Sequence, residues 1–174
     1  MKNIRVILLY LLMVWPHLMS IIGAVSDVAY LIYLISIVVV CIISAINAIT
    51  YPSDASPEKL AWWALIIKLA HIPFYIKIFV GGLLMLPASL LTIMVAFAWF
   101  IYLLLFVVDY LFLLSSSAYS VKAIWTAKKQ GIIPKSLAVI LSIFSFIFVT
   151  DIISAIVAYV LVKKNSQYKR SVEE

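Results

Sequence analysis

Charged side chains are scarce in this sequence, and their absence is most complete between Lys77 and Asp109. The stretch from Ile78 to Val108 contains no Asp, Glu, Lys, Arg or His. Of the 174 residues, only 11% are charged and 67% are hydrophobic, and the mean hydropathy is +1.21. A soluble globular domain carries about 25% charged and about 45–50% apolar residues. The composition therefore excludes a soluble domain and indicates a membrane protein with several apolar helices.

Residues that build covalent, metal or nucleotide sites are also rare. The single cysteine, Cys41, excludes an intrachain disulfide and a cysteine-based metal cage. Two histidines, His17 and His71, cannot form a zinc site alone. The Gly81-Gly82 pair lacks the context of a phosphate-binding loop. We therefore expect no metal and no cofactor. The net charge of +6 belongs mainly to the ends of apolar segments, so it indicates no nucleic-acid partner.

The apolar segments predict an all-α fold, a polytopic helical membrane bundle. Residues 1–164 form one unit and residues 165–174 form a polar tail. Four segments are apolar enough to be firm transmembrane helices, and a fifth is ambiguous. The predicted spans are residues 4–23, 28–50, 57–81 (the ambiguous one), 88–114 and 136–162.

Short signals predict the local geometry of these spans. Pro16 has no N–H for the carbonyl of Leu12, which predicts a kink in the first span. Ser56 is a natural N-cap, with Pro57 in the first helical turn that follows. In the second span, small side chains share one face and predict close helix packing. These are Cys41, Ser44, Ala45 and Ala48.

The ambiguous segment 57–81 carries a polar stripe. At 100° per residue, Lys68 and His71 share a face with two alanines, and Tyr75 continues that face. About ten large apolar residues favour insertion by roughly 0.3–0.6 kcal/mol each, whereas a central lysine opposes it by about 2.5–3.5 kcal/mol. Either the segment crosses the membrane with partners inside the bundle, or it lies in the interface as an amphipathic elbow.

The number of crossings decides the orientation. Lys2 and Arg5 predict a cytoplasmic N-terminus. Five crossings place the basic connection 122–135 in the cytoplasm and the tail outside, whereas four crossings reverse both. The short breaks at 52–57 and 82–87 favour five. The connection includes a short helix, residues 121–129, expected to lie against headgroups. Its lysines either attract anionic lipid or act only as a topology signal, and the topology signal is favoured. Its surface basic residues are Lys122, Lys128, Lys129 and Lys135.

Ionisable residues at membrane depth are the best functional candidates. Asp151 lies near the centre of its predicted span, and Lys68 near the centre of 57–81, so we expect them to pair with His71 close by. The pair is either an ion- or proton-responsive site, a seat for a polar ligand, or a structural pair that fixes helix register. The secondary candidates are His17, Tyr75 and Asp109; we expect His17 to bond freed backbone or face headgroups, and Asp109 to be an interfacial anchor.

Two motifs resemble those of an uncharacterised group of small polytopic membrane proteins of Gram-positive bacteria. They are Lys68-Leu-Ala-His71-Ile-Pro73-Phe-Tyr75 and Asp151-Ile-Ile-Ser154-Ala155, the latter ahead of Lys163-Lys164. The resemblance covers the last two thirds of the chain. It implies a bacterial plasma membrane and carries no known activity or functional residue.

Three hypotheses for the function follow. The first is a transport-like or ligand-responsive bundle that uses Lys68, His71 and Asp151. The second is an accessory, immunity or regulatory partner of a larger membrane complex, or a homo-oligomer. The third is a membrane enzyme acting on lipid-linked substrates; it is disfavoured because the sequence shows no recognisable nucleophile or metal set.

Overall fold

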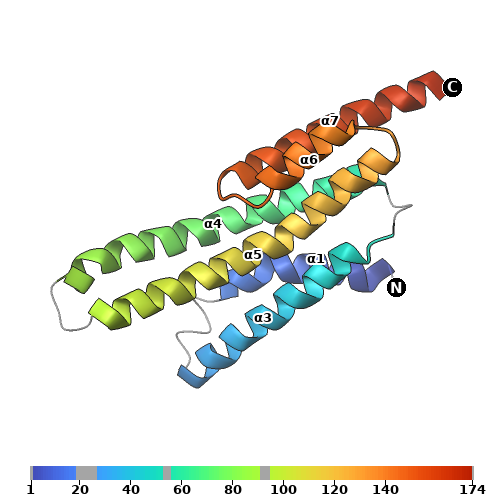
Figure 1. The fold of residues 1–174 in the computed structure, drawn as a ribbon. Helices are drawn as coiled ribbons and strands as arrows, with labels where there is room; N and C mark the ends of the chain where they lie inside the picture. Colours follow the sequence, from blue (N-terminus) through green and yellow to red (C-terminus); the bar gives the residue numbers. More distant parts are fainter. Residues whose placement is uncertain (1, 19–26, 53–55, 91–94, 174) are drawn as a thin grey trace.

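The computed structural model describes residues 2–18, 27–52, 56–90 and 95–173, and these residues form an all-helical bundle (Figure 1). Three of its helices are long and apolar enough to cross a membrane. The predicted polytopic helical membrane bundle is therefore confirmed. The elements are α1 (Lys2–Val14), the 3₁₀ helix η1 (Trp15–Leu18), α3 (Asp27–Ile49), α4 (Pro57–Leu90), α5 (Val95–Lys129), α6 (Lys135–Phe144) and α7 (Thr150–Glu173).

The first helix changes its winding where proline interrupts it. The α-helix ends at Val14, and the 3₁₀ helix η1 contains Pro16. Tyr33 of α3 donates a hydrogen bond to the carbonyl of Trp15 at 3.0 Å, and the Trp15 indole donates to Ser36 at 3.1 Å. These contacts fix the interrupted end of α1 against α3.

The ambiguous segment belongs to α4, which packs alongside α5 (Figure 1). The helix begins as predicted, with the N–H of Lys59 bonded to the Ser56 hydroxyl at 3.5 Å. Its polar face is buried, since Lys68 and His71 are 1% and 0% exposed. This placement disfavours an interfacial elbow. The break predicted at 82–87 is absent, because a helix in an apolar medium satisfies its own backbone groups and so tends to continue.

The last predicted span is wrong, because residues 136–162 form a helical hairpin instead of one helix. Helix α6 ends at Phe144, and α7 begins at Thr150 and packs back against α6 (Figure 1). The turn contains Val149 with a φ of 70°, and the Thr150 hydroxyl bonds the carbonyls of Phe144 and Ile147 at 3.1 and 3.0 Å. Side-chain bonding therefore makes a turn that no glycine or proline marks in the sequence.

Two further boundaries differ from the prediction. Helix α5 continues to Lys129, so residues 121–129 are the end of a long helix and do not lie apart from the bundle. The serines at 115–117 do not break it because each hydroxyl donates a hydrogen bond to a backbone carbonyl. Ser116, for example, donates to the carbonyl of Leu113 at 3.0 Å. The polar tail is also helical, as α7 extends to Glu173.

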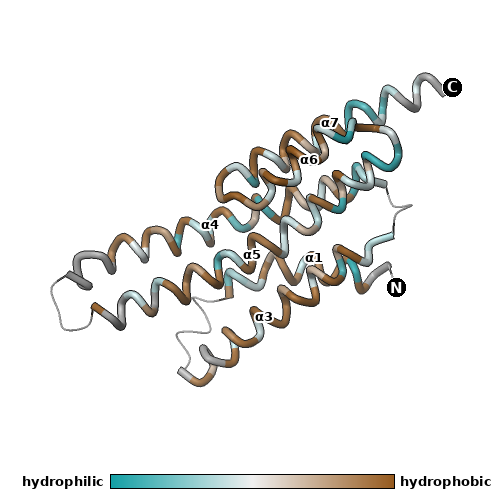
Figure 2. Tube along the Cα trace, viewed as in Figure 1, coloured by the Kyte–Doolittle hydropathy of each residue, from teal (hydrophilic) through white to brown (hydrophobic). Residues whose placement is uncertain are grey.

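The start of α1 and the end of α7 lie at the same end of the bundle, together with residues 50–52, the start of α4 and the turn 130–134 (Figure 1). Arg5 donates to the carbonyl of Thr50 at 3.1 Å, and Asn165 of α7 donates to that of Ile132 at 3.0 Å. Hydrophilic residues gather at this end, whereas the rest of the bundle is largely hydrophobic (Figure 2). We call it the basic end.

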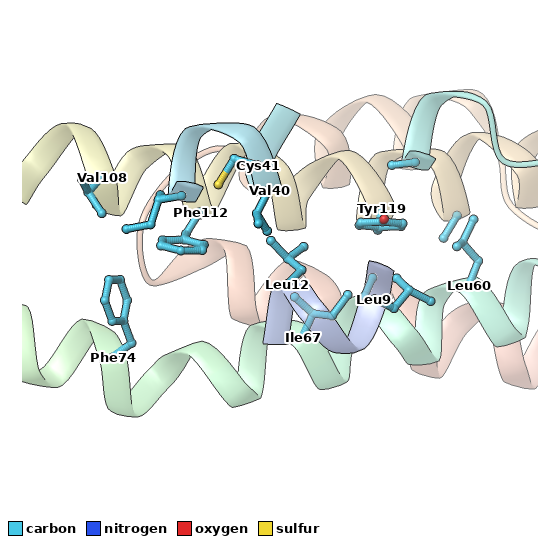
Figure 3. Packing of buried hydrophobic residues seen from close by; sticks show 14 of the residues in the cluster. Leu9, Leu12, Val40, Cys41, Leu60, Ile67, Phe74, Val108, Phe112 and Tyr119 are labelled. Atoms are coloured by element: carbon cyan, nitrogen blue, oxygen red, sulfur yellow. The ribbon is translucent and has the colours of Figure 1, made fainter. Parts of the chain in front are cut away.

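The core lies where α1, α3, α4 and α5 meet (Figure 3). Leu9 and Leu12 of α1 are fully buried against Ile67 of α4 and Phe112 of α5. A second apolar cluster joins the end of α5 to the hairpin, with Ile124 at its centre. Its other buried members are Ala127, Ile133, Ala138, Leu141, Ala158 and Val162. The hairpin is thus packed on α5 by small and aliphatic side chains.

Candidate functional site: a buried ion pair at the hairpin turn

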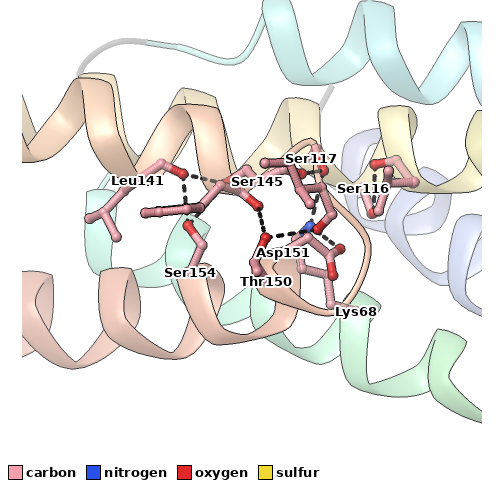
Figure 4. A network of polar contacts seen from close by, with 11 residues as sticks. Lys68, Ser116, Ser117, Leu141, Ser145, Thr150, Asp151 and Ser154 are labelled. Atoms are coloured by element: carbon pink, nitrogen blue, oxygen red, sulfur yellow. Dashed lines mark hydrogen bonds and ion pairs between the residues drawn. The ribbon is translucent and has the colours of Figure 1, made fainter.

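The predicted contact between Lys68 and Asp151 is present. The Lys68 ammonium donates to Asp151 Oδ2 at 2.6 Å, and the two side chains are 1% and 2% exposed (Figure 4). Lys68 lies eleven residues after Pro57, about 16 Å along α4 at ~1.5 Å per residue, which is half of a bilayer core of ~30 Å. Lys68 therefore lies within the part of α4 that is long and apolar enough to cross a membrane.

Local structure supports the charge on Asp151. This residue lies in the first turn of α7, where the helix dipole favours an anion. Helix α6 has ten residues, about 15 Å, so the hairpin reaches only about halfway along a membrane-spanning helix before it turns. The half-length hairpin thus brings the amino end of α7 to the level of Lys68.

Serines complete the polar contacts around the pair. Lys68 also donates to the Ser117 hydroxyl of α5 at 3.0 Å, and that hydroxyl donates in turn to the backbone carbonyl of Ser145 at the end of α6. The chain of bonds links α4, α5 and the hairpin turn (Figure 4). It gives the ammonium two partners, which matters because a buried charge without them is costly.

A second group of bonds holds the two arms of the hairpin together. Ser154 of α7 donates to the carbonyl of Leu141 at 2.7 Å, and its hydroxyl lies 3.2 Å from that of Ser145. The Ser145 hydroxyl donates to the same carbonyl at 2.8 Å. These contacts make the hairpin a unit, and Lys68 of α4 and Ser117 of α5 supply polar contacts to it beside the apolar packing.

The histidines bond backbone and do not join the ion pair. His71 Nε2 donates to the carbonyl of Leu12 at 2.9 Å, and its Nδ1 is buried without a hydrogen-bond partner. His17 Nε2 donates to the carbonyl of Ala70 at 2.8 Å. Each histidine therefore joins α4 to the first helical segment. Among the described residues, no group of three His, Cys, Asp or Glu could hold a metal ion.

Tyr75 and Asp109 lie together in a groove between α4 and α5. The Tyr75 hydroxyl and Asp109 Oδ1 are buried atoms without a hydrogen-bond partner. The predicted span 88–114 placed Asp109 near the end of a helix. In the structure α5 continues to Lys129, so Asp109 lies about midway along the helix and is one of the residues that line this groove.

The basic candidates lie toward the basic end. Lys122 donates to the carbonyl of Ile49 at 2.9 Å, and Lys128 lies 5.5 Å from the centre of the Trp125 ring. Lys129 and Lys135 are exposed. The four lysines therefore line the connection from α5 to α6 beside the ends of α3 and α7.

Sequence reasoning missed Ser117 and Ser145 as partners of the pair. The only signal was the density of hydroxyls in Ser115-Ser-Ser and around Ser145, in segments otherwise almost wholly apolar. Serines within apolar helices commonly bond their own backbone, so composition alone could not separate Ser117, which bonds across helices, from Ser116, which does not.

These observations define a class of protein: an integral-membrane helical bundle closed by a half-length hairpin and a buried Lys–Asp pair. The particular family follows from the sequence. Residues 2–167 match DUF6652, a family of unknown function, and the chain belongs to that family. The finding agrees with the resemblance to an uncharacterised group of membrane proteins. No curated protein and no solved structure matches the chain.

Proposed function

We propose that this protein is a non-enzymatic, ion- or ligand-responsive membrane protein whose responding element is the α6–α7 hairpin. The observation that supports the proposal is the buried contact between Lys68 and Asp151, which ties the hairpin turn to α4. The transition is between a docked hairpin, with the pair formed, and a released hairpin, with the pair broken.

The energetics favour a responding element over a simple brace. Apolar residues of similar volume often stabilise a core as well as a buried ion pair does, whereas breaking such a pair by neutralising one partner costs about 3–5 kcal/mol. An ion or ligand that competes for Asp151 would leave Lys68 charged and unpaired. One small chemical event could therefore shift the equilibrium of the hairpin.

The sealed surroundings of the pair argue against an open pathway in this conformation. Both side chains are almost fully buried, and three cavities within the described part of the chain are lined by other residues. A transport-like cycle would have to expose the pair by moving the hairpin. We therefore place the response in the hairpin and not in a permanent channel.

The proposed location is a bacterial plasma membrane, with the basic end in the cytoplasm. All lysines and arginines other than Lys68 and Lys77 belong to segments that meet at that end (Figure 1). The positive-inside rule then gives a cytoplasmic N-terminus and C-terminus. The first segment, α3, α4 and α5 make four crossings, and the hairpin enters and leaves on the cytoplasmic side. The exposed lysines also suit anionic headgroups.

Thiol labelling of the hairpin turn tests the proposed response. In a Cys41→Ser background, Val149→Cys places a reporter at the turn, where the side chain is 73% exposed on the outside of the bundle. In the docked state a membrane-impermeant maleimide should label it poorly from the cytoplasmic side. Lys68→Met and Asp151→Asn should each raise the labelling rate severalfold, because each leaves the remaining group without its partner.

Removing both charges together separates control by the pair from other effects of substitution. The double variant Lys68→Met with Asp151→Leu leaves neither charge unpaired, so its labelling rate should stay close to that of the native pair. If Lys68→Met and Asp151→Asn label no faster than this double variant, the pair does not control the hairpin and the proposal is wrong.

A second candidate function is an accessory subunit of a membrane complex. Beyond the hairpin turn, α4 and α5 continue as a two-helix arm that the hairpin does not cover (Figure 1). Phe79, Trp99 and Phe100 of this arm are more than 60% exposed. Photo-crosslinking from position 99 in native membranes would test the candidate; a discrete adduct supports a partner, and lipid adducts alone contradict it.

A further inference from the structure

The groove between α4 and α5 begins where the hairpin ends. It has a volume of about 310 Å³ and is open to the outside of the bundle. Aromatic and aliphatic side chains line most of it, among them Phe79, Leu83, Tyr102 and Phe106. Tyr102 donates to the carbonyl of Gly82 at 2.6 Å, which closes one wall of the groove. Its size and lining are those of a site for a small apolar ligand.

Two polar atoms in the lining have no partner. Oδ1 of Asp109 and the hydroxyl of Tyr75 are each buried and form no hydrogen bond. Among the described residues, Asp109 also forms no ion pair, unlike Asp151, which is joined to Lys68. An ionisable group within a membrane helix normally pairs with another group or marks a ligand pathway. The carboxylate therefore has an oxygen, Oδ1, whose bonding capacity the described residues leave unused.

We propose that this groove binds a monovalent organic cation with an apolar body, such as a quaternary or protonated amine that partitions into the bilayer. The Asp109 carboxylate would neutralise the charge. Tyr75, Phe79, Tyr102 and Phe106 supply aromatic rings, which attract cations and also cover apolar substituents. A neutral ligand of the same shape would fill the groove but leave the carboxylate unpaired.

The groove is in contact with the hairpin turn through aromatic rings. The Phe148 ring centre lies 6.1 Å from that of Tyr75 and 6.5 Å from that of Phe106. Tyr75 and Phe106 both line the groove. Phe148 is three residues before Asp151 in the chain. Binding of the cation would therefore bear on the docking of the hairpin; this consequence, unlike the binding itself, rests on the proposed function.

Binding is tested by titrating the purified full-length protein with benzyltriethylammonium in detergent micelles, using isothermal calorimetry. The uncharged carbon isostere, in which carbon replaces nitrogen, is the matched ligand. We expect the cation to bind at least about tenfold more tightly than the isostere, because only the cation pairs with a carboxylate in a medium of low dielectric constant.

The residues are tested with Asp109→Asn and Tyr75→Phe, each checked for an unchanged helical spectrum. Asp109→Asn should abolish the preference for the cation, and Tyr75→Phe should weaken binding severalfold. Glu58→Gln, at the opposite end of α4, should leave binding unchanged. Equal binding of the two ligands, or a cation preference that survives in Asp109→Asn, overturns the proposal and assigns the groove to lipid chains.

Labelling of Val149→Cys with and without the cation distinguishes the two proposals. A change in labelling rate that requires Asp109 supports both the binding site and the responsive hairpin. Specific binding without a change in labelling supports the site and contradicts its coupling to the hairpin. Faster labelling of the Lys68→Met and Asp151→Asn variants without cation binding supports the responsive hairpin and overturns the site.

Discussion

The imidazole of His71 occupies the place of a backbone donor that Pro16 cannot supply to Leu12. In a regular α-helix the carbonyl of Leu12 would accept from the N–H of residue 16, and proline has none. His71 Nε2 donates to that carbonyl at 2.9 Å from α4, in a fully buried position. The histidine thus satisfies a proline-induced defect in a neighbouring helix.

Replacement of His71 should therefore be costly only while Pro16 is present. His71→Phe leaves the Leu12 carbonyl buried without a donor, and we expect a loss of about 1–3 kcal/mol in the free energy of unfolding. In a Pro16→Ala background the restored N–H can serve that carbonyl, so the same substitution should cost less. Unfolding in mixed micelles, followed by circular dichroism, measures both differences. Equal costs in the two backgrounds would show that His71 acts through packing alone.

The adjacent serines of α5 offer a matched comparison. Ser117→Ala removes a hydroxyl that accepts from Lys68 and donates to the carbonyl of Ser145, so it should destabilise the protein by about 1–3 kcal/mol. Ser116→Ala removes only a bond within its own helix and should cost less than about 1 kcal/mol. The same unfolding assay gives both values. A difference near zero would mean that Ser117 does not help to hold the hairpin.

The placement of both chain ends predicts a specific labelling pattern in intact cells. In a Cys41→Ser background, single cysteines at Lys129 and Lys164 should both resist an impermeant maleimide added outside, because both lie toward the basic end. A cysteine at Val95, at the opposite end of α5, should react. Reaction at only one of positions 129 and 164 would restore a fifth crossing over residues 136–162 and contradict the hairpin.

The turn of the hairpin contains a conformation that suits glycine. Val149 has a φ of 70°, where a side chain with a Cβ costs about 1–2 kcal/mol. The free energy of unfolding of Val149→Gly should consequently exceed that of Val149→Ala by about 1 kcal/mol, as measured by denaturant titration. At most positions glycine lowers stability relative to alanine. A glycine variant that is more stable than the alanine variant is therefore diagnostic of a positive φ. If Val149→Ala is the more stable variant, residue 149 does not hold a positive φ in the native protein.

Apolar composition and helix signals could predict the membrane bundle, the start of α4 at Pro57 and the buried face that carries Lys68. The hairpin could not be predicted in this way. Residues 136–162 are long and apolar enough for one span, and hydrophobicity does not distinguish one full-length helix from two half-length ones. The turn depends on the Thr150 hydroxyl and on Val149 at positive φ, and neither residue type normally marks a turn.

The contact between Lys68 and Asp151 could be predicted although the fold around Asp151 was wrong. Both residues were placed at membrane depth, and an ionisable residue there normally has a partner. The contact is still made because the hairpin turns after about 15 Å, which brings Asp151 level with Lys68. The bonds of the histidines to backbone carbonyls depend on which helices are neighbours, and residue spacing carries no such information.

The hairpin has a consequence for biosynthesis. Lys68 and Asp151 are separated by 83 positions, so the lysine leaves the ribosome long before its partner exists. During that interval the ammonium of a partly inserted chain must be held by water or by other components of the insertion machinery. Docking of the hairpin separates the Lys68 ammonium from water and from these components. Closure of the pair thus becomes possible only when translation is almost complete, and a chain truncated before α7 would present an unmatched membrane-embedded cation to cellular proteases.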